Sequence, residues 1–387
     1  MKKNRILSKR VDRIFWSSIE KISQEVKKRK VINFVSGLPD PRYMPMDILY
    51  ELMCETYEEH GREILMYPGA YGLEVLREEI KRFLERHGVN TRSKEVIITC
   101  GAQHAVSSIA RAVLDDNDVY AVENPTFMET FLAMKYYSDN YLPIDVSPEG
   151  LDIVALRRAS SEEIKLLYVV PRGQNPTGIS YSDDVRREIA EISNEMGFLI
   201  VEDDPYGIIV ERKVKAISNI AENAIYVGSF SKILAPGLRV GFMLIPKEFF
   251  EKIGMTMQLD FATHPLSMFV VYEALRRGIV ESVLENLRKV YRRKTRIALS
   301  TIEETMPKGV EWTKPEISFH IMLFLNGTNA EKLLERSLKK GVAFVPGKMF
   351  YIKNPREDSI RISFSQPREE EIEKGIGIIA ETIREIS

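Results

Sequence analysis

The residue best suited to covalent chemistry in this sequence is Lys232, which lies in a loop between two apolar runs. Residues 224–227 and 240–245 are apolar and predict buried strands on either side of the loop. A lone loop lysine is usually a solvated charge, but partial burial favours the neutral amine that condenses with an aldehyde. Donors for a phosphate dianion lie close by in sequence: Ser229, Ser231 and Arg239.

Two adjacent carboxylates, Asp203 and Asp204, follow the apolar run 198–201, which predicts another strand. Ligands of open α/β sheets collect at the carboxyl ends of strands, so the pair lies where a ligand is expected. A buried aspartate needs a cationic partner, and a protonated ring nitrogen would be one. Neighbouring strand residues point to opposite faces, so only one of these carboxylates can take that role.

A strand, a glycine turn and a helix follow one another over residues 96–113. The free N–H groups at the start of a helix bind anions, and Gly101 permits a backbone angle that other residues rarely adopt. Such turns are also common without a ligand. We interpret Gly101, Ala102 and Gln103 as a possible anion site.

Two further side chains depend for their chemistry on what surrounds them. Phe127 follows the strand predicted at 119–122, and its ring could stack on a flat cofactor or simply pack in the core. Arg361 alternates with apolar residues over 360–364, so it points inward and must find an anion. That anion is either a substrate carboxylate, bound by two parallel hydrogen bonds, or an internal acidic residue.

Composition bounds the class of protein. The 387 residues, 44% hydrophobic and 29% charged, suffice for two domains. Apolar strands alternate with helical patterns such as that at 185–196, which predicts an α/β fold. The net charge of -1 suggests no nucleic-acid partner. No apolar run reaches the ~18 residues of a membrane span, and two cysteines without metal or disulfide spacing favour a cytoplasmic protein without a metal.

Four motifs in order carry a resemblance: Asn175-Pro176-Thr177-Gly178, Asp203-Asp204-Pro205-Tyr206, Ser229-Phe230-Ser231-Lys232 with Arg239, and Arg361-Ile362-Ser363-Phe364. The chain resembles the class I/II aminotransferases that depend on pyridoxal phosphate (PLP), especially the aromatic, kynurenine and 2-aminoadipate branch. The resemblance implies fold type I, with a three-layer large domain around a mainly parallel seven-stranded sheet and a smaller α+β C-terminal domain. It divides the chain into an N-terminal arm joining the small domain (1–38), the large domain (39–280) and the small domain (281–387).

The resemblance also implies roles for the cofactor ligands. Lys232 would hold PLP as a Schiff base and act as the base on the substrate Cα. Asp203 would pair with the ring nitrogen, with Asp204 as the alternative, while Tyr206 and Asn175 would contact the phenolic oxygen. Stacking falls to Phe127. The phosphate would be bound by Gly101, Ala102, Gln103, Ser229, Ser231, Arg239 and, from a neighbouring subunit, Tyr67.

Substrate and assembly follow from the same resemblance. Arg361 would bind the α-carboxylate, with Asn175 beside it, and Gly37 would line the entrance. A tyrosine shared between subunits requires a homodimer. The reaction would be ping-pong transfer from an L-amino acid to a 2-oxo acid, most simply 2-oxoglutarate.

The sequence leaves the donor open. Many relatives have a glycine-containing pair where this chain has Ile317 and Ser318, so the substrate pocket departs from the pattern. A C–S lyase or decarboxylase of the same fold is a second hypothesis, although an arginine holding the carboxylate argues against decarboxylation. A ligand sensor is a third, but about 30 leading residues are too few for a DNA-binding domain.

Overall fold

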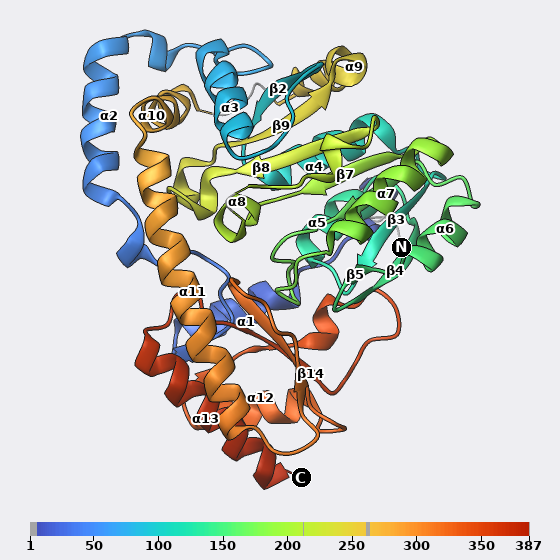
Figure 1. Cartoon of the computed structure of the whole chain (residues 1–387), viewed down its shortest axis with the longest axis vertical. Helices are drawn as coiled ribbons and strands as arrows, with labels where there is room; N and C mark the ends of the chain where they lie inside the picture. The colour runs from blue at the N-terminus through green and yellow to red at the C-terminus, as the bar shows by residue number, and fades with distance from the viewer. Residues whose placement is uncertain (1–5, 212, 261–263, 387) are drawn as a thin grey trace.

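The computed structural model describes residues 6–211, 213–260 and 264–386, and residues 1–5, 212, 261–263 and 387 lie outside the description (Figure 1). Its centre is an eight-stranded sheet. In spatial order the strands are β2 (Lys94–Thr99), β9 (Gly241–Pro246), β8 (Ala224–Ser229), β7 (Leu199–Asp203), β6 (Leu166–Val169), β3 (Val119–Asn124), β4 (Asn140–Ser147) and β5 (Gly150–Leu151).

Strands β8, β7, β6, β3 and β4 are parallel neighbours, whereas β9 runs antiparallel between β2 and β8. The expected mainly parallel sheet of seven strands is therefore present. The eighth strand, β5, has two residues and pairs antiparallel with β4 at the edge. A strand of two residues is too short to leave a periodic pattern in the sequence.

Helices cover both faces of this sheet, because alternate strand residues are apolar toward each side. On β8, Ile225 and Val227 face one core cluster, and Ala224 and Tyr226 face two clusters on the other side. The first face carries α4 (Ala102–Val113), α5 (Met128–Lys135) and α9 (Lys247–Met257). The second carries α3 (Glu74–Arg86), α6 (Ile153–Ser160), α7 (Asp183–Met196), α8 (Gly207–Val210) and α10 (Pro265–Arg276).

A smaller antiparallel sheet lies below the first in Figure 1 and has the order β10-β11-β14-β13. Its strands are β10 (Glu311–Trp312), β11 (His320–Phe324), β14 (Ser359–Ser363) and β13 (Val345–Pro346). The helices α12 (Ala330–Lys339) and α13 (Glu369–Ile386) pack on it. The long helix α11 (Ile279–Thr305) runs between the two parts, with Leu284 in the upper core and Ile302 in the lower.

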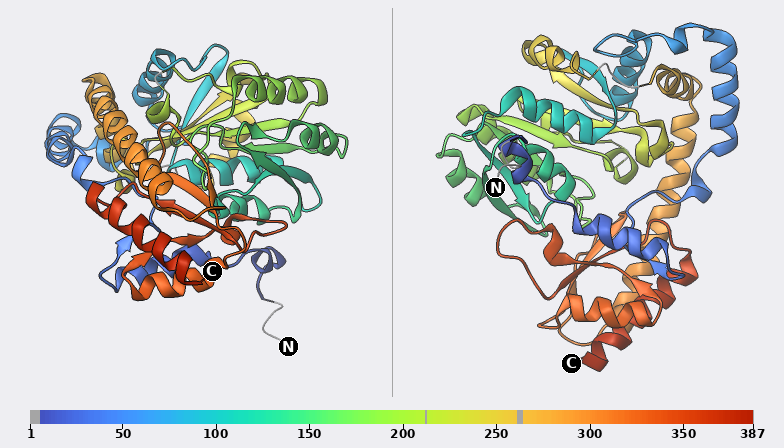
Figure 2. Two further views of the ribbon diagram at one scale, coloured as in Figure 1. Left: turned by 60° about the horizontal axis from the view of Figure 1, so that its bottom comes forward. Right: turned by 180° about the vertical axis from the view of Figure 1, so that it is seen from behind.

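Residues 18–33 of the N-terminal segment lie against this smaller part (Figure 2), whereas Arg13 and Ser17, just before them, bond to Asp116 and Glu129 of the large part. Helix α1 (Ser18–Lys27) contributes Val26 to a small core with Phe350. Strand β1 (Ile32–Asn33) pairs with β12 (Val342–Ala343). The division into an arm (1–38), a large domain (39–280) and a small domain (281–387) stays a proposal, supported for the arm by the packing of α1 and β1 on the small part. The boundary at 280 falls in the first turn of α11.

Helix α2 (Met46–His60) stands at the outer edge and has many exposed apolar side chains. Among the described residues, no helix combines the length and apolarity needed to cross a bilayer.

Candidate active site

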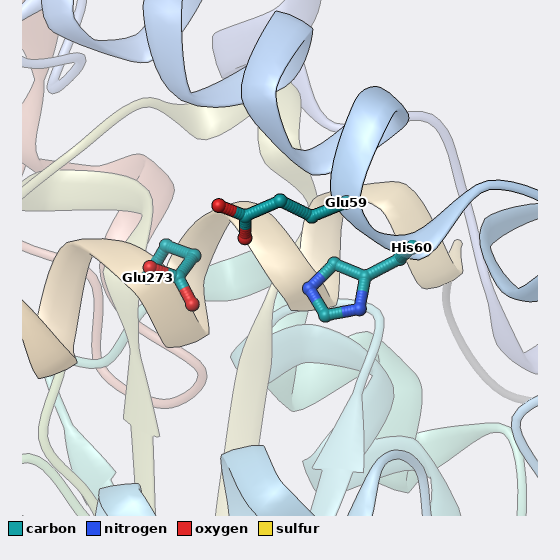
Figure 3. Close-up of side chains that lie close together, drawn as sticks. All are labelled: Glu59, His60 and Glu273. Atoms are coloured by element: carbon teal, nitrogen blue, oxygen red, sulfur yellow. The ribbon is translucent and has the colours of Figure 1, made fainter.

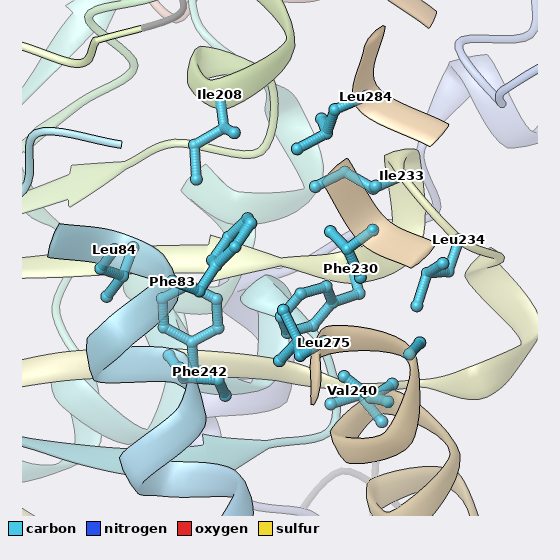
Figure 4. Packing of buried hydrophobic residues seen from close by; sticks show 14 of the residues in the cluster. Phe83, Leu84, Ile208, Phe230, Ile233, Leu234, Val240, Phe242, Leu275 and Leu284 are labelled. Carbon is cyan, nitrogen blue, oxygen red and sulfur yellow. The ribbon is translucent and has the colours of Figure 1, made fainter. Parts of the chain in front are cut away.

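The loop that carries Lys232 is fixed by aromatic packing. It leaves β8 at Ser229 and forms two short 3-10 turns, Phe230–Lys232 and Pro236–Leu238, before β9 begins. The Phe230 ring is buried, with ring centroids 5.9 Å from Phe83 and 5.8 Å from Phe242 (Figure 4). This packing anchors the residue two positions before the lysine and so sets where the amine points.

The Lys232 amine lies in a largely dry, cationic environment. Its Nζ donates a hydrogen bond to the Gly37 carbonyl at 3.0 Å and lies 5.9 Å from the centre of the Tyr206 ring. Burial, followed by the charges of Arg361 and Arg239, lowers the pKa of Lys232 to about 8. Loss of the proton from the Lys232 amine therefore takes place much closer to neutral pH than in an ordinary lysine, and the neutral amine is the form that nucleophilic and base chemistry requires.

Asp203 is a buried carboxylate with one oxygen free of protein partners. Its Oδ2 accepts a hydrogen bond from Tyr168 Oη at 2.8 Å, while Oδ1 has no partner among the described residues. Burial is the main cause that raises the pKa of Asp203 to about 7, and the neighbouring Asp204 adds to it. A buried acceptor without a donor is costly, so Oδ1 has the geometry to receive an N–H from a ligand.

Asp204 is fully occupied by protein donors and points into a separate buried cluster. It accepts from Arg172 Nε at 2.9 Å, Tyr226 Oη at 2.7 Å and the Gly207 N–H at 2.7 Å. Arg172 also pairs with Glu202 at 2.6 Å. These contacts leave Asp204 no capacity for a ligand and favour Asp203 as the ligand carboxylate.

Arg361 is a buried guanidinium without an acidic partner. It donates to Asn175 Oδ1 at 3.0 Å and to the Val35 carbonyl, and its carbon Cζ lies 4.8 Å from the centre of the Phe350 ring. Its Nε has no partner, and no carboxylate in the described chain lies within ion-pair distance. Burial lowers the pKa of Arg361 to about 10. An internal salt bridge, the alternative expected from sequence, is therefore absent from the described residues, and the guanidinium is available to an external anion.

A cradle for a second anion forms where β2 and β8 end and β9 begins. Gly101 adopts φ +79° at the start of α4, and a Cβ there would lie 2.5 Å from a terminal nitrogen of Arg239. Arg239 in turn donates to the Cys100 carbonyl at 2.8 Å. Beside them, Ser229 Oγ and Ser231 Oγ lie 2.9 Å apart. Backbone donors, two hydroxyls and one guanidinium thus converge at a helix N-terminus.

The predicted residues Ala102, Gln103 and Phe127 lie at the starts of two neighbouring helices. Ala102 opens α4, and the Gln103 amide donates to the Glu129 carbonyl of α5 at 2.7 Å. Phe127 immediately precedes α5 and is half-buried. The side chain of Gln103 is therefore engaged with protein, which leaves its backbone N–H as the group suited to an anion.

Tyr67 lies in the loop before α3, and its side chain is 80% exposed. This exposure leaves its face accessible to another molecule. Its assignment to a phosphate in a neighbouring subunit stays a prediction.

Three residues that support the site were not identified as site residues from the sequence. Tyr168 holds Asp203, Arg172 holds Asp204, and His320 places its Nε2 3.3 Å from Tyr206 Oη. Tyr168 lies on the strand next to the one that carries Asp203, so strand order would have indicated it. Nothing local in the sequence marks the other two as partners of these residues.

A separate group of possible metal ligands lies on α2 and α10, away from this site: Glu59, His60 and Glu273 (Figure 3). The Glu273 carboxylate already receives hydrogen bonds from Arg276 at 2.6 Å and Arg277 at 2.8 Å. The His60 ring stacks on Phe269 at 3.9 Å. These contacts describe an ion-pair network and assign no metal.

The site residues fit PLP on three independent observations. The unpartnered Oδ1 of Asp203 suits the N–H of a pyridinium ring. The cradle around Gly101 has the donors for a phosphate. Lys232 and Arg361 donate to the carbonyls of Gly37 and Val35, two residues apart, so the amine lies near a guanidinium that has no acidic partner among the described residues.

Comparisons with known proteins agree with this geometry. The family profile described as aminotransferase class I and II matches residues 29–379. The aromatic-amino-acid aminotransferase 1 of Thermococcus litoralis is 31% identical over 95% of this chain and 92% of its own. The 2-aminoadipate transaminase of Thermus thermophilus is 31% identical over 94% and 93%. The crystal structure of Pyrococcus horikoshii kynurenine aminotransferase in complex with PMP covers 99% of this chain and 98% of its own, with a TM-score of 0.93 and 33% identity.

Proposed function

The chain belongs to the class I and II aminotransferases, and from this premise we propose that it moves the amino group of an L-amino acid to a 2-oxo acid with PLP bound at Lys232. The observation that carries the proposal is that the Lys232 amine and the buried Arg361 guanidinium donate to the same short segment, while Arg361 has no acidic partner among the described residues. When bound, PLP supplies the carbon that exchanges amino groups and a ring that disperses negative charge.

Arg361, Lys232 and Asp203 have separate roles in the proposed reaction. Arg361 binds the α-carboxylate of the amino acid and so orients its Cα toward Lys232. The Lys232 amine would remove the proton from the substrate Cα and would return it to the carbon that PLP supplies for the exchange of amino groups. Asp203 keeps the ring nitrogen protonated, because an ionised Oδ1 stabilises that N–H. Tyr206 and Asn175 donate toward the phenolic oxygen.

The substrate class is proposed from the relatives and the pocket. The relatives named above act, by their names, on aromatic amino acids, 2-aminoadipate and kynurenine. We extend to this chain an aromatic or 2-aminoadipate-like donor and 2-oxoglutarate as acceptor. Ile317 and Ser318 are both buried, and Ser318 Oγ bonds the His320 backbone, so this stretch is a tightly packed wall. A packed wall restricts the donors that fit.

A homodimer with shared sites is part of the proposal. Its support is the exposed Tyr67 and a run of exposed apolar residues on one side of the molecule. They comprise Met46, Ile48, Tyr50, Met53, Tyr57, Leu65 and Met66. Light scattering should give twice the 44.5 kDa chain mass, and Tyr67→Phe should weaken PLP binding. A monomer with full PLP affinity would overturn this part.

A cytoplasmic location is also proposed. Its support is that neither Cys54 nor Cys100 forms a disulfide.

The half-reaction tests the activity directly. The purified protein with PLP is given excess L-glutamate, 2-aminoadipate or phenylalanine, without oxo acid, and its absorption is followed. We expect the visible band of the lysine-bound cofactor to be replaced by the near-ultraviolet band of the amine form, with one oxo acid released per site. Lys232→Ala should abolish the change. Continuous release of oxo acid and ammonia without the amine form would indicate a lyase instead.

A further inference from the structure

The imidazole of His320 belongs to the face of the small sheet that carries Arg361. His320 opens β11 and lies opposite Ser363 on β14, while Met322 lies opposite Arg361. Opposed residues of antiparallel strands share a face, and alternate residues return to it. His320 and Arg361 are therefore diagonal neighbours on one face, and that face is turned toward Lys232.

The ring of His320 is enclosed by the active site. It is fully buried, its Nε2 lies 3.3 Å from Tyr206 Oη, and the two rings meet edge to face at 5.8 Å. On its other side a Cβ at Gly37 would lie 2.8 Å from His320 Cε1. The carbonyl of the same Gly37 accepts a hydrogen bond from Lys232, so Gly37 lies between the imidazole and the proposed base.

The backbone of His320 is held as tightly as its ring. Its N–H donates to Ser318 Oγ at 3.0 Å, and that hydroxyl donates to its carbonyl at 2.9 Å. A Cβ at Gly178, in the loop that carries Asn175, would lie 2.1 Å from the His320 carbonyl oxygen. The position of Nε2 opposite Tyr206 is thus fixed from both sides.

The position of the ring proton follows from the contacts. Burial, with the charges of Arg361 and Lys232, lowers the pKa of His320 well below its usual value, so the ring is neutral and has one N–H. Nδ1 has no partner among the described residues. A buried N–H without an acceptor is rarer and costlier than a buried lone pair, so the proton belongs on Nε2.

We propose that His320 is a positioning residue whose Nε2–H donates to the Tyr206 hydroxyl oxygen, so that the single Tyr206 proton is directed at the phenolic oxygen of PLP. The hydrogen bond between His320 and Tyr206 does not depend on the proposed function, whereas its effect on the phenolic oxygen of PLP does. Donation to the oxygen of a hydroxyl makes that hydroxyl a better donor. A better donor stabilises a negative phenolic oxygen, which favours the form of the cofactor that has lost its proton.

The charged and titratable groups that face this pair are Lys232 and Arg361 on the His320 side and Asp203 and Arg361 on the Tyr206 side. A shift in cofactor titration could come from any of them. The test must therefore isolate the contact between His320 and Tyr206.

The first measurement needs no cofactor. Apoprotein labelled with ¹⁵N-histidine contains five histidines, and loss of one set of signals in His320→Phe assigns His320. Two-bond ¹H–¹⁵N correlations then report which ring nitrogen has the proton. We expect the His320 proton on Nε2 from pH 5 to 8. The His320 ring signals should shift in Tyr206→Phe and should stay unchanged in His87→Gln, since His87 lies at the far end of α3. An Nδ1–H ring, or titration near pH 6.5, would overturn the proposal.

The second measurement uses the PLP-bound enzyme and its visible absorption band. His320→Phe should raise the pH midpoint of that band by about 0.4–1 pH unit, the equivalent of one ordinary hydrogen bond. His320→Gln, which can restore an N–H, should recover part of the shift. In a Tyr206→Phe background, His320→Phe should add nothing. An equal shift in that background would show that His320 does not act through Tyr206. Failure of the proposed function, by contrast, would show as no band at all.

Discussion

Lys232 and Arg361 donate to carbonyl oxygens only two residues apart, those of Gly37 and Val35. One short segment therefore binds both cations of the site. Asp40, three residues further on, pairs with the buried Lys294 of α11 at 2.9 Å and fixes the end of the segment. The separation between Lys232, the proposed base, and Arg361, the proposed carboxylate-binding residue, is thus set by the backbone of residues 35–37.

Replacing Arg361 with lysine keeps the charge but loses the planar fork. We expect kcat/KM for amino donors to fall about 10- to 100-fold, because a charged hydrogen bond contributes ~1.5–3 kcal/mol. Steady-state kinetics with 2-aminoadipate and phenylalanine measure the loss. Arg187→Lys, on the exposed side of α7, is the matched control and should leave kinetics unchanged. Equal activity of Arg361→Lys and wild type would exclude a bidentate contact.

The adjacent carboxylates should respond in opposite ways to the same substitution. Asp203→Asn should lower turnover roughly 100-fold or more, because it removes the charge opposite the ring nitrogen. Apo thermal stability at pH 8 should not fall, since the lost carboxylate was buried with one oxygen unpartnered. Asp204→Asn breaks a buried ion pair with Arg172 and should destabilise by about 3–5 kcal/mol. Thermal unfolding and kinetics of both variants test the assignment, and a reversed pattern would transfer the cofactor role to Asp204.

Lys232 should make apoprotein stability depend on pH. Its folded pKa of about 8 is below the ordinary lysine pKa of 10.5, so the unfolded chain binds more protons between these pH values. Stability therefore rises with pH across this window, and well below pH 8 the buried charge costs about 3–3.5 kcal/mol. Lys232→Met should unfold at a higher temperature than wild type at pH 7. The difference should shrink as the pH approaches 10.5, and a constant difference would show that the amine is not responsible.

Gly101 and Gly197 form a matched pair for testing the phosphate cradle. Both have φ near +80°, but ψ is 171° at Gly101 and 15° at Gly197. A Cβ at Gly101 meets Arg239, whereas no atom of the described residues lies within 4 Å of a Cβ at Gly197. Gly197→Ala should cost about 1 kcal/mol of stability, because Gly197 has a left-handed backbone. Gly101→Ala should cost more, about 1–3 kcal/mol, because the backbone angles of Gly101 are ones that essentially only glycine adopts. Only Gly101→Ala should also weaken PLP binding, measured by titrating apoprotein with PLP. Unchanged affinity in Gly101→Ala would remove Gly101 from the cradle.

The sequence was sufficient where function depends on neighbours in the chain. The apolar runs around Lys232 predicted strands β8 and β9, and the alternation at Arg361 predicted its inward direction on β14. The choice between Asp203 and Asp204 could not be made from the alternation alone. It depends on Arg172 and Tyr226, which reach Asp204 from other elements.

His320 shows the same limit more clearly. Residues 316–320 differ from the pattern of many relatives. The sequence reveals that difference, but it does not indicate which residue His320 contacts. The contact with Tyr206 requires the register of β11 against β14 and the close approach of Gly37. Both are tertiary properties, set by residues 43 and 283 positions away. The shared role of Tyr67 likewise depends on a second chain and stays a prediction.

Helix α11 has a mechanical consequence. Its 27 residues contain neither glycine nor proline, so it is a stiff rod of about 40 Å with no internal hinge. One end is embedded beneath the large sheet and the other beneath the strand that bears Arg361. Any swing of the small sheet must therefore pivot the whole rod, and a tilt of 3° would move its far end by about 2 Å. Movements of that size at Arg361, the proposed carboxylate-binding residue, would be transmitted through α11 to α10 and the exposed apolar face beside it.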